Sequence, residues 1–298
     1  MSFASEVKNE LCRTPVDSRC CAVSESYGIL LYCNTFTNQA VRILTESRPF
    51  AKRLPILFKR AFGFEFDQLP QEDSAGKLVL SVTAPEKMDK IFDVFGFDRQ
   101  RALAHHINFG VMEEDCCRQS FLRGAFLAGG SVTDPKKNYH LELITDHASV
   151  SRETAALLRE MDFASKSTSR NGHYITYFKN SVIMEDLLTT IGAPVSAMQI
   201  MEAKIIKGMV SSVNRVVNCD TANTTKAVEA AAVQCDAIRR LRESGELDTL
   251  PDKLRETALL RLENPEMTLS QLAELSVPPV TKSCLNHRLR KLMELARI

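Results

Sequence analysis

Hydrophobic and polar positions along the chain follow two regular patterns. Four short stretches alternate apolar with polar residues, which predicts half-buried β-strands at 41–45, 77–83, 139–145 and 173–179. Four longer stretches carry apolar residues at helical spacing, which predicts amphipathic helices at 49–63, 85–96, 149–162 and 181–192. Gly96 and Gly192 stand where a helix C-terminus favours glycine. The pattern therefore predicts an α+β fold.

The second half of this series repeats the first. The vicinal pairs Cys20-Cys21 and Cys116-Cys117 lie 96 residues apart, and Gly28 and Gly124 follow them at the same interval. Each copy is predicted as α-β-β-α-β-β-α. One strand of each copy has a weak signal and is placed around 62–66 and 162–167.

Two sheets of this size must be buried together, and the simplest solution packs the two leading helices against each other near a pseudo-two-fold axis. Close packing there needs small residues. The second leading helix supplies them: Gly124, Ala125, Ala128, Gly129 and Gly130. Glycine inside a helix costs about 1 kcal/mol relative to alanine, so a close contact is expected in return. Gly129-Gly130 also marks the end of that helix.

The C-terminal segment reads as three helices, at 251–266, 268–276 and 281–296. Thr268 and Gln271 have the spacing of a capping box, and Val277-Pro278-Pro279 cannot continue a helix. A helix, a short helix, a turn and a longer helix together predict a helix-turn-helix.

The third of these helices has one apolar and one cationic face. Leu285, Leu289, Leu292 and Ala296 form its predicted buried stripe. The candidate DNA-binding residues lie at its N-terminus, beside the stripe or opposite it: Thr281, Lys282, Ser283, Asn286, His287, Arg288, Arg290 and Lys291. Arg290 suits guanine, Asn286 suits adenine, and the helix N-terminus suits phosphate. The alternative is a solvated amphipathic helix or a dimerisation arm.

Between the repeat and this module, two helices are predicted at 194–219 and 226–245, with a hinge at 248–252. Asn and Asp residues around the break between them are interpreted as helix caps. The alternative is a secondary DNA contact from Lys204, Lys207 and Arg215. The predicted organisation is an N-terminal helix at 1–20, a double repeat at 21–210 (copies of about 21–112 and 113–210), a helical linker at 211–250 and a helix-turn-helix at 251–298.

The amino-acid composition excludes several classes of protein. Hydrophobic residues make up 44% and charged residues 25%, which excludes a disordered chain. The net charge is +1, so DNA binding needs a local excess of cations. From 268 to 298 there are five Lys or Arg against two Asp or Glu, which provides one. No apolar run is long enough for a membrane span, and the first residues lack a secretory signal.

The nine cysteines include no CxxC pair, and their odd number indicates reduced thiols in the cytoplasm. Adjacent side chains on a helix point about 100° apart, so each vicinal pair is a poor zinc signature. The cysteines are expected to be small buried apolar residues, with no metal and no cofactor.

The segment FLRGAFLAGGSV (121–132) resembles the motif helix of the LAGLIDADG homing endonucleases. That resemblance implies a duplicated αββαββα saddle that sits over DNA, with a metal-binding acid at the end of each motif helix. The matching positions here are Cys33 and Gly129, and neither is an acid; Asp134 lies five residues too late. The saddle is therefore expected to be a degenerate, catalytically inactive scaffold.

In combination, the motifs resemble the WhiA family along essentially the whole chain. They are MSFASEVKNEL, a Cys pair before each motif helix, FLRGAFLAGGSVTDP, NRVVNCDTANTTKAVEAA and NHRLRKL. This resemblance implies a bacterial, nucleoid-associated transcriptional regulator linked to cell division, chromosome segregation or sporulation. It implies double-stranded DNA as partner, with a sigma factor or RNA polymerase as a further candidate. The competing hypotheses are an active endonuclease or RNA maturase, and a protein-interaction adaptor.

Overall fold

The computed structural model describes residues 2–71, 76–100 and 105–296. The chain divides into two compact units, Met1–Gly208 and Met209–Ile298. The first unit mixes helices with two antiparallel sheets, and in the second every regular element is helical. This confirms the predicted fold class.

The second copy of the repeat has all seven predicted elements. They are α5 (Asp115–Gly129), β4 (Gly130–Val132), β5 (Leu141–Thr145), α6 (Ala148–Glu160), β6 (Lys166–Arg170), β7 (His173–Phe178) and α7 (Ser181–Ile191). Its four strands form an antiparallel sheet in the order β4-β5-β7-β6. The strand placed around 162–167 begins only at Lys166, because Asp162 has a positive φ and turns the chain.

The first copy is shorter by one strand in its described residues. It contains α2 (Arg19–Tyr32), β1 (Thr35–Phe36), β2 (Val41–Thr45), α3 (Arg48–Phe62), β3 (Leu78–Val82) and α4 (Pro85–Phe95), with sheet order β1-β2-β3. The strand predicted at 62–66 is wrong. Phe64 and Phe66 are buried against Phe62 and Phe58, so ring packing and not a ladder of hydrogen bonds fixes this segment.

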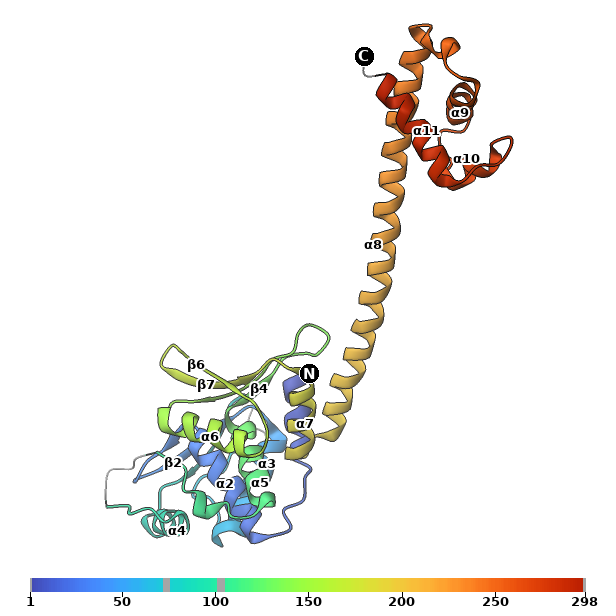
Figure 1. The fold of residues 1–298 in the computed structure, drawn as a ribbon. Helices are drawn as coiled ribbons and strands as arrows, with labels where there is room; N and C mark the ends of the chain where they lie inside the picture. Colours follow the sequence, from blue (N-terminus) through green and yellow to red (C-terminus); the bar gives the residue numbers. More distant parts are fainter. Residues whose placement is uncertain (1, 72–75, 101–104, 297–298) are drawn as a thin grey trace. The chain divides into compact units, whose positions relative to one another are not determined.

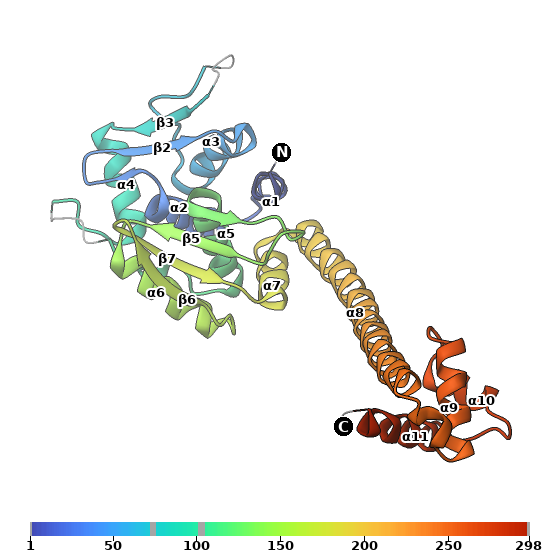
Figure 2. The same cartoon turned by 90° about the horizontal axis from the view of Figure 1, so that it is seen from above.

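Each sheet buries one face against helices. In β2 and β3 the paired residues Val41 and Val82, and Ile43 and Leu80, are buried, which follows from the period-two pattern. Figure 1 shows the strands of the second copy above the helices that they cover. In Figure 2, seen from above, the strands of the two copies lie side by side.

Helices α2 and α5 pack so closely that their backbones touch. A Cβ atom on Gly28 would lie 2.1 Å from the Phe121 carbonyl oxygen, and one on Gly124 would lie 2.1 Å from the Glu25 carbonyl oxygen. Gly28 corresponds to Gly124, and Glu25 corresponds to Phe121, 96 residues later. The two contacts are therefore equivalent, as a two-fold axis requires. The predicted close contact between the leading helices is therefore confirmed. Gly129 also ends α5, so both interpretations of the glycines hold.

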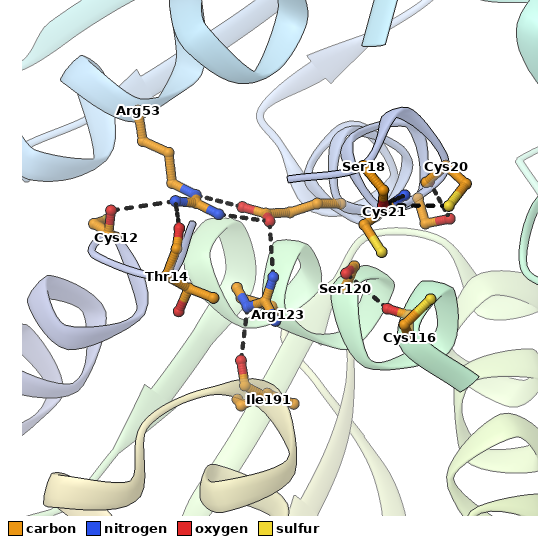
Figure 3. Close-up of polar contacts among 12 residues, drawn as sticks. Cys12, Thr14, Ser18, Cys20, Cys21, Arg53, Cys116, Ser120, Arg123 and Ile191 are labelled. Carbon is orange, nitrogen blue, oxygen red and sulfur yellow. Dashed lines mark hydrogen bonds and ion pairs between the residues drawn. The ribbon is translucent and has the colours of Figure 1, made fainter. Parts of the chain in front are cut away.

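Beside this contact, the buried carboxylate of Glu25 joins two arginines. Arg53 Nε lies 2.6 Å from Glu25 Oε1, and Arg123 Nη1 lies 3.1 Å from Glu25 Oε2. Arg123 Nε also donates to the Ile191 carbonyl oxygen at 2.7 Å. Figure 3 shows Arg53 and Arg123 converging from different helices. Both members of each ion pair are buried, and one carboxylate faces two guanidinium groups, so a net charge of +1 remains that the Cys12, Thr14 and Ile191 carbonyl oxygens help to stabilise.

The N-terminal helix α1 (Phe3–Leu11) caps the helix that leaves the repeat. The Glu10 carboxylate accepts from the backbone N–H groups of Val195 and Ser196 at 2.7 and 2.9 Å. These residues open α8 (Pro194–Glu243), one uninterrupted helix of 50 residues. A carboxylate at this end satisfies free donors and the helix dipole.

The predicted break at 219–224 is therefore wrong, and the Asn and Asp residues there are not caps. After Pro194 the helix contains no proline and only one glycine, Gly208. An Asn or Asp costs only about 0.7 kcal/mol or less in a helix interior, which is too little to interrupt one. The predicted stop at Gly245 is confirmed by its left-handed φ of 76°.

The second unit completes its core with short helices after α8. They are η2 (Glu246–Thr249), which overlaps the predicted hinge, then α9 (Asp252–Glu263), α10 (Leu269–Leu275) and α11 (Lys282–Leu295). Ile238 and Leu241 of α8 join the buried leucines of these helices in one hydrophobic cluster.

Gly124→Ala should destabilise the first unit by about 3 kcal/mol or more, because the new Cβ meets the Glu25 carbonyl in a packed backbone contact. Gly208→Ala is the matched control. It is also a helical glycine, but nothing lies within 4 Å of its Cβ, so alanine should be neutral or stabilise by up to about 1 kcal/mol. Urea unfolding of both variants measures the difference, and equal stabilities would contradict the close contact.

Candidate nucleic-acid interface

Helix α11 is a capped helix with free donors at its N-terminus. The Thr281 side chain accepts from the Cys284 backbone N–H at 3.2 Å. Lys282 and Ser283 form the first turn and are exposed. The helix dipole and the remaining N–H groups give this end a partial positive charge, which suits a phosphate.

The two faces of α11 lie as the sequence pattern predicts. Leu285, Leu289 and Leu292 are each at most 1% exposed and hold the helix against the second unit's core. The exposed residues include seven of the eight candidates: Thr281, Lys282, Ser283, Asn286, His287, Arg290 and Lys291. The structure therefore brings these side chains together on one element, accessible to a ligand.

Arg288 differs from the other candidates. Its side chain is half-buried, and Nη1 lies 3.5 Å from the Thr257 hydroxyl of α9. Arg290, by contrast, has a loose contact with Glu294 at 4.0 Å as its ion pair among the described residues, and both side chains are largely exposed. Arg290 is therefore the better placed of the two for a partner outside the chain.

The connection between α10 and α11 is longer than in a compact helix-turn-helix. It comprises residues 276–281, and Val280 N–H donates to the Ala273 carbonyl at 3.0 Å. The predicted capping box at the start of α10 is confirmed: the side chains of Thr268 and Gln271 each accept from the other residue's backbone N–H. Helix–turn–helix geometry is thus present, with a turn lengthened by Pro278 and Pro279.

One buried contact that fixes this module was missed by sequence reasoning. Arg261 of α9 is 2% exposed, donates from Nε to Gln234 Oε1 at 2.9 Å and donates from Nη1 to the Met267 carbonyl at 2.7 Å. It ties α8 to the segment that precedes α10. The sequence does contain a signal for its burial, because Arg261 lies on the same face of the helix as the apolar residues Leu254 and Ala258.

The candidate secondary contacts behave differently from one another. Lys204 Nζ lies 3.5 Å from the buried Glu185 carboxylate. Lys207 Nζ lies 4.5 Å from the centre of the Tyr139 ring and donates to the Lys137 carbonyl. Both lysines thus have partners within the first unit. Arg215 is exposed, and within the described part of the chain its polar contact is with Ser211, one turn earlier on α8.

The ends of α2 and α5 do not fit the divalent ion that a homing-endonuclease fold implies. At the end of α2, the Cys33 thiol lies 3.3 Å from the Leu30 and Thr35 carbonyls, and burial raises its pKa to about 12. At the end of α5, a Cβ on Gly129 would lie 2.4 Å from the Ile144 carbonyl oxygen. A magnesium ion needs hard oxygen ligands, and these two positions provide none. Asp134, the next carboxylate, accepts from Lys136 N–H within its own turn.

The cysteine pairs were expected to be buried apolar residues, and this is wrong for two of the four. Cys20 and Cys116 are exposed, Cys21 is half-buried and Cys117 is buried. The four thiols, which come from two distant segments of the chain, lie together at the start of α2 and α5.

Comparison with known proteins extends these observations. Residues 118–210 match the family model described as the WhiA LAGLIDADG-like domain, and residues 213–296 match the WhiA C-terminal HTH domain. The "Probable cell division protein WhiA" of Ruminiclostridium cellulolyticum is 36% identical and covers 99% of this chain and 97% of its own length. The chain belongs to the WhiA family. The protein of the same name from Staphylococcus aureus strain JH9 is also 36% identical, over 99% of this chain and 96% of its own length.

A solved WhiA structure has the same architecture. The crystal structure of full-length DUF199/WhiA from Thermatoga maritima matches with a TM-score of 0.61 at 25% identity, covering 100% of this chain and 98% of that one. The chain therefore combines a WhiA LAGLIDADG-like unit with a WhiA helix-turn-helix. Within the described residues, every helix is too short or too polar to cross a membrane.

Thr268→Ala should loosen α10 by about 1 kcal/mol, because it removes one half of the capping box. Amide hydrogen exchange of residues 269–275 reports this loss locally. Thr268→Ser keeps the capping oxygen and serves as the matched control, so its exchange should stay close to that of the unchanged protein. Equal exchange in the alanine and serine variants would show that the box does not stabilise α10.

Proposed function

We propose that this WhiA-family protein is a sequence-specific, double-stranded DNA-binding transcriptional regulator. Its target processes would be cell division, chromosome segregation or sporulation. The observation that carries the proposal is α11, a capped helix whose apolar stripe is buried while Lys282, Asn286, Arg290 and Lys291 remain exposed. The relatives' name supports the link to cell division.

In this proposal α11 lies in the major groove. Its N-terminal residues Thr281, Lys282 and Ser283 bind phosphate, which fixes orientation without reading sequence. Arg290 offers two parallel donors to the O6 and N7 atoms of guanine, and Asn286 pairs with the N6 and N7 atoms of adenine. His287 and Lys291 lie on the same exposed side and add backbone contacts. Arg288 contributes mainly by holding α11 against α9.

The first unit acts as a scaffold without nuclease chemistry. Cys33 is protonated at neutral pH, and Gly129 has no space for any side chain. Because the Gly129 backbone packs against Ile144 and Tyr32, this position cannot gain a carboxylate without moving a strand. These contacts favour a non-enzymatic role over an active endonuclease or RNA maturase.

A single helix-turn-helix reads about one half-site, so useful specificity needs a second contact. A second copy of the chain, the first unit, or a sigma factor with RNA polymerase could provide it. Of the three cations considered on α8, Arg215 is the one that has no partner beyond its own helix among the residues that the structure describes, so it is the preferred secondary DNA contact. The location that fits this proposal is the bacterial cytoplasm, at the nucleoid.

Arg290→Ala should weaken binding to the preferred duplex by about 1–3 kcal/mol and relax specificity at one base pair. Lys282→Ala should weaken binding to all duplexes alike and reduce the slope of log affinity against log salt by about one. Genome-wide mapping of bound sites supplies the duplex, and fluorescence anisotropy over a salt series measures both effects.

The matched control for these variants is Arg242→Ala, which removes one exposed positive charge from α8 of the same unit. It should change affinity and the salt slope far less than either α11 variant. Unchanged binding for both Arg290→Ala and Lys282→Ala would show that α11 is not the reader. A protein-interaction adaptor, the remaining rival, would show no salt-dependent binding to any duplex.

Plasmid incubated with the full chain and Mg²⁺ or Mn²⁺ should stay intact, because Cys33 and Gly129, at the ends of α2 and α5, offer no carboxylate to hold the ion. Agarose electrophoresis of supercoiled plasmid detects even single nicks. The plasmid carries the mapped binding site, so that a lack of substrate cannot explain the result. Specific cleavage that a chelator abolishes would overturn the scaffold assignment and favour the endonuclease.

A further inference from the structure

The two cysteine pairs occupy matching positions in the two copies of the repeat. Cys20 and Cys21 are the second and third residues of α2, and Cys116 and Cys117 are the second and third residues of α5. The Gly28–Gly124 contact aligns the helices so that both first turns lie at the same end. Figure 3 shows Cys20 and Cys21 on one helix and Cys116 on the other at this end.

The four sulfur atoms all lie within 4.8 Å of one another. In a tetrahedral zinc site with Zn–S bonds of about 2.3 Å, the sulfurs are about 3.8 Å apart, so small side-chain movements suffice. Among the described residues, this is the one group of three or more His, Cys, Asp or Glu side chains that converge in this way. All nine cysteines are free thiols, so no disulfide competes for these sulfurs.

The two-fold arrangement also answers the objection to vicinal cysteines. One helix alone directs adjacent side chains about 100° apart, which leaves a single pair poorly suited to hold a metal. Two helices related by a two-fold axis supply two such diverging pairs that face each other. Four cysteine side chains arranged as two facing, diverging pairs can surround a single metal ion tetrahedrally.

The surroundings favour thiolate over thiol once a cation is present. Helix N-termini stabilise negative charge, and two of them meet here. Four close thiols cannot all ionise alone, because each negative charge opposes the next. A divalent cation removes that opposition.

The first turns are held in place by hydrogen bonds at equivalent positions. The Ser24 hydroxyl lies 3.0 Å from the Cys20 carbonyl oxygen, and the Ser120 hydroxyl lies 2.7 Å from that of Cys116. Ser18 Oγ, the N-cap of α2, accepts from Cys21 N–H at 3.2 Å. A preorganised backbone reduces the entropy lost when ligands bind a metal.

We propose that Cys20, Cys21, Cys116 and Cys117 bind one structural zinc ion that fastens the two copies of the repeat together. Four sulfur ligands in tetrahedral arrangement select zinc over magnesium, calcium or manganese, which prefer oxygen. All four positions are filled by protein, which makes the site structural and not catalytic. The ion links α2 to α5 at their N-termini, through cysteine pairs that lie 96 residues apart in the chain.

The test measures metal in the full chain, purified without an affinity tag under reducing conditions. Elemental analysis by inductively coupled plasma mass spectrometry should find about one zinc per chain. Removal of the zinc with a chelator should lower the unfolding temperature of the protein by about 5 °C or more. Co²⁺ added to the chelated protein should give the absorption of a tetrahedral tetrathiolate complex. Less than about a tenth of a zinc per chain, with no Co²⁺ spectrum, would overturn the proposal.

Variants then assign the ligands. Cys20→Ser and Cys116→Ser change exposed thiols, so both should fold, and each should weaken Zn²⁺ binding by about 100-fold or more in competition with a chromophoric chelator. Cys219→Ser, an exposed cysteine of α8 outside the cluster, is the matched control and should bind zinc as the unchanged chain does. Equal zinc affinity in all three variants would contradict the site, as would a disulfide between the pairs under reducing conditions.

Discussion

The backbone contact between α2 and α5 is the constraint from which the first unit is built. Gly28 and Gly124 let the two helices approach until each glycine touches a carbonyl oxygen of the other helix. Because the contact is two-fold, it fixes what lies at both ends of the pair. At one end, Gly129 leads directly into β4 and sets the start of a sheet. At the other end, the same alignment brings four thiols together.

The charge cluster around Glu25 depends on this contact and extends it. Glu25 is three residues before Gly28, and its carboxylate reaches Arg123, which directly precedes Gly124. Arg53 also donates hydrogen bonds to the Cys12 and Thr14 carbonyls, and Arg123 donates one to the Ile191 carbonyl at the end of α7. Buried ion pairs contribute little net stability, since desolvation offsets their attraction. We therefore expect the cluster to act mainly by specifying which segments meet.

Much of the architecture could be predicted from the sequence, because period-two and helical patterns record which face is buried. The strand Leu141–Thr145, the capping box at Thr268 and the leucine stripe of α11 all follow from local rules. Local rules failed where tertiary packing decides. Phe64 and Phe66 look like a strand but pack as rings, and the Asn-rich segment of α8 looks like a break but is only a weak helix former.

The candidate sites divide in the same way. The exposed face of α11 depends on the residue spacing within a single helix. A helical wheel of this segment therefore correctly predicts that Lys282, Asn286 and Arg290 are exposed. The thiol cluster and the Arg261 contact join residues far apart in the chain, and only the fold brings them together. Divergence of adjacent side chains argues against a metal when one helix is considered alone. Once the two-fold axis is known, the same divergence favours a metal site, because the second copy of the repeat places a second diverging cysteine pair opposite the first.

The two ends of the α2–α5 pair explain why metal chemistry fits one end and not the other. A homing-endonuclease fold implies carboxylates at the helix C-termini, where the helix dipoles oppose negative charge and a divalent ion must offset it. With Cys33 and Gly129 in those positions, no such charge remains, and Gly129 packs against Ile144 as a carboxylate could not. The N-termini lie about 20 Å away along a 14-residue helix, and there the dipoles favour anions. Thiolates at that end are stabilised by the same helices that would destabilise catalytic acids at the other. The dipoles therefore favour a thiolate-bound metal at the N-terminal end of the pair, whereas at the C-terminal end Cys33 and Gly129 offer no carboxylate to a divalent ion.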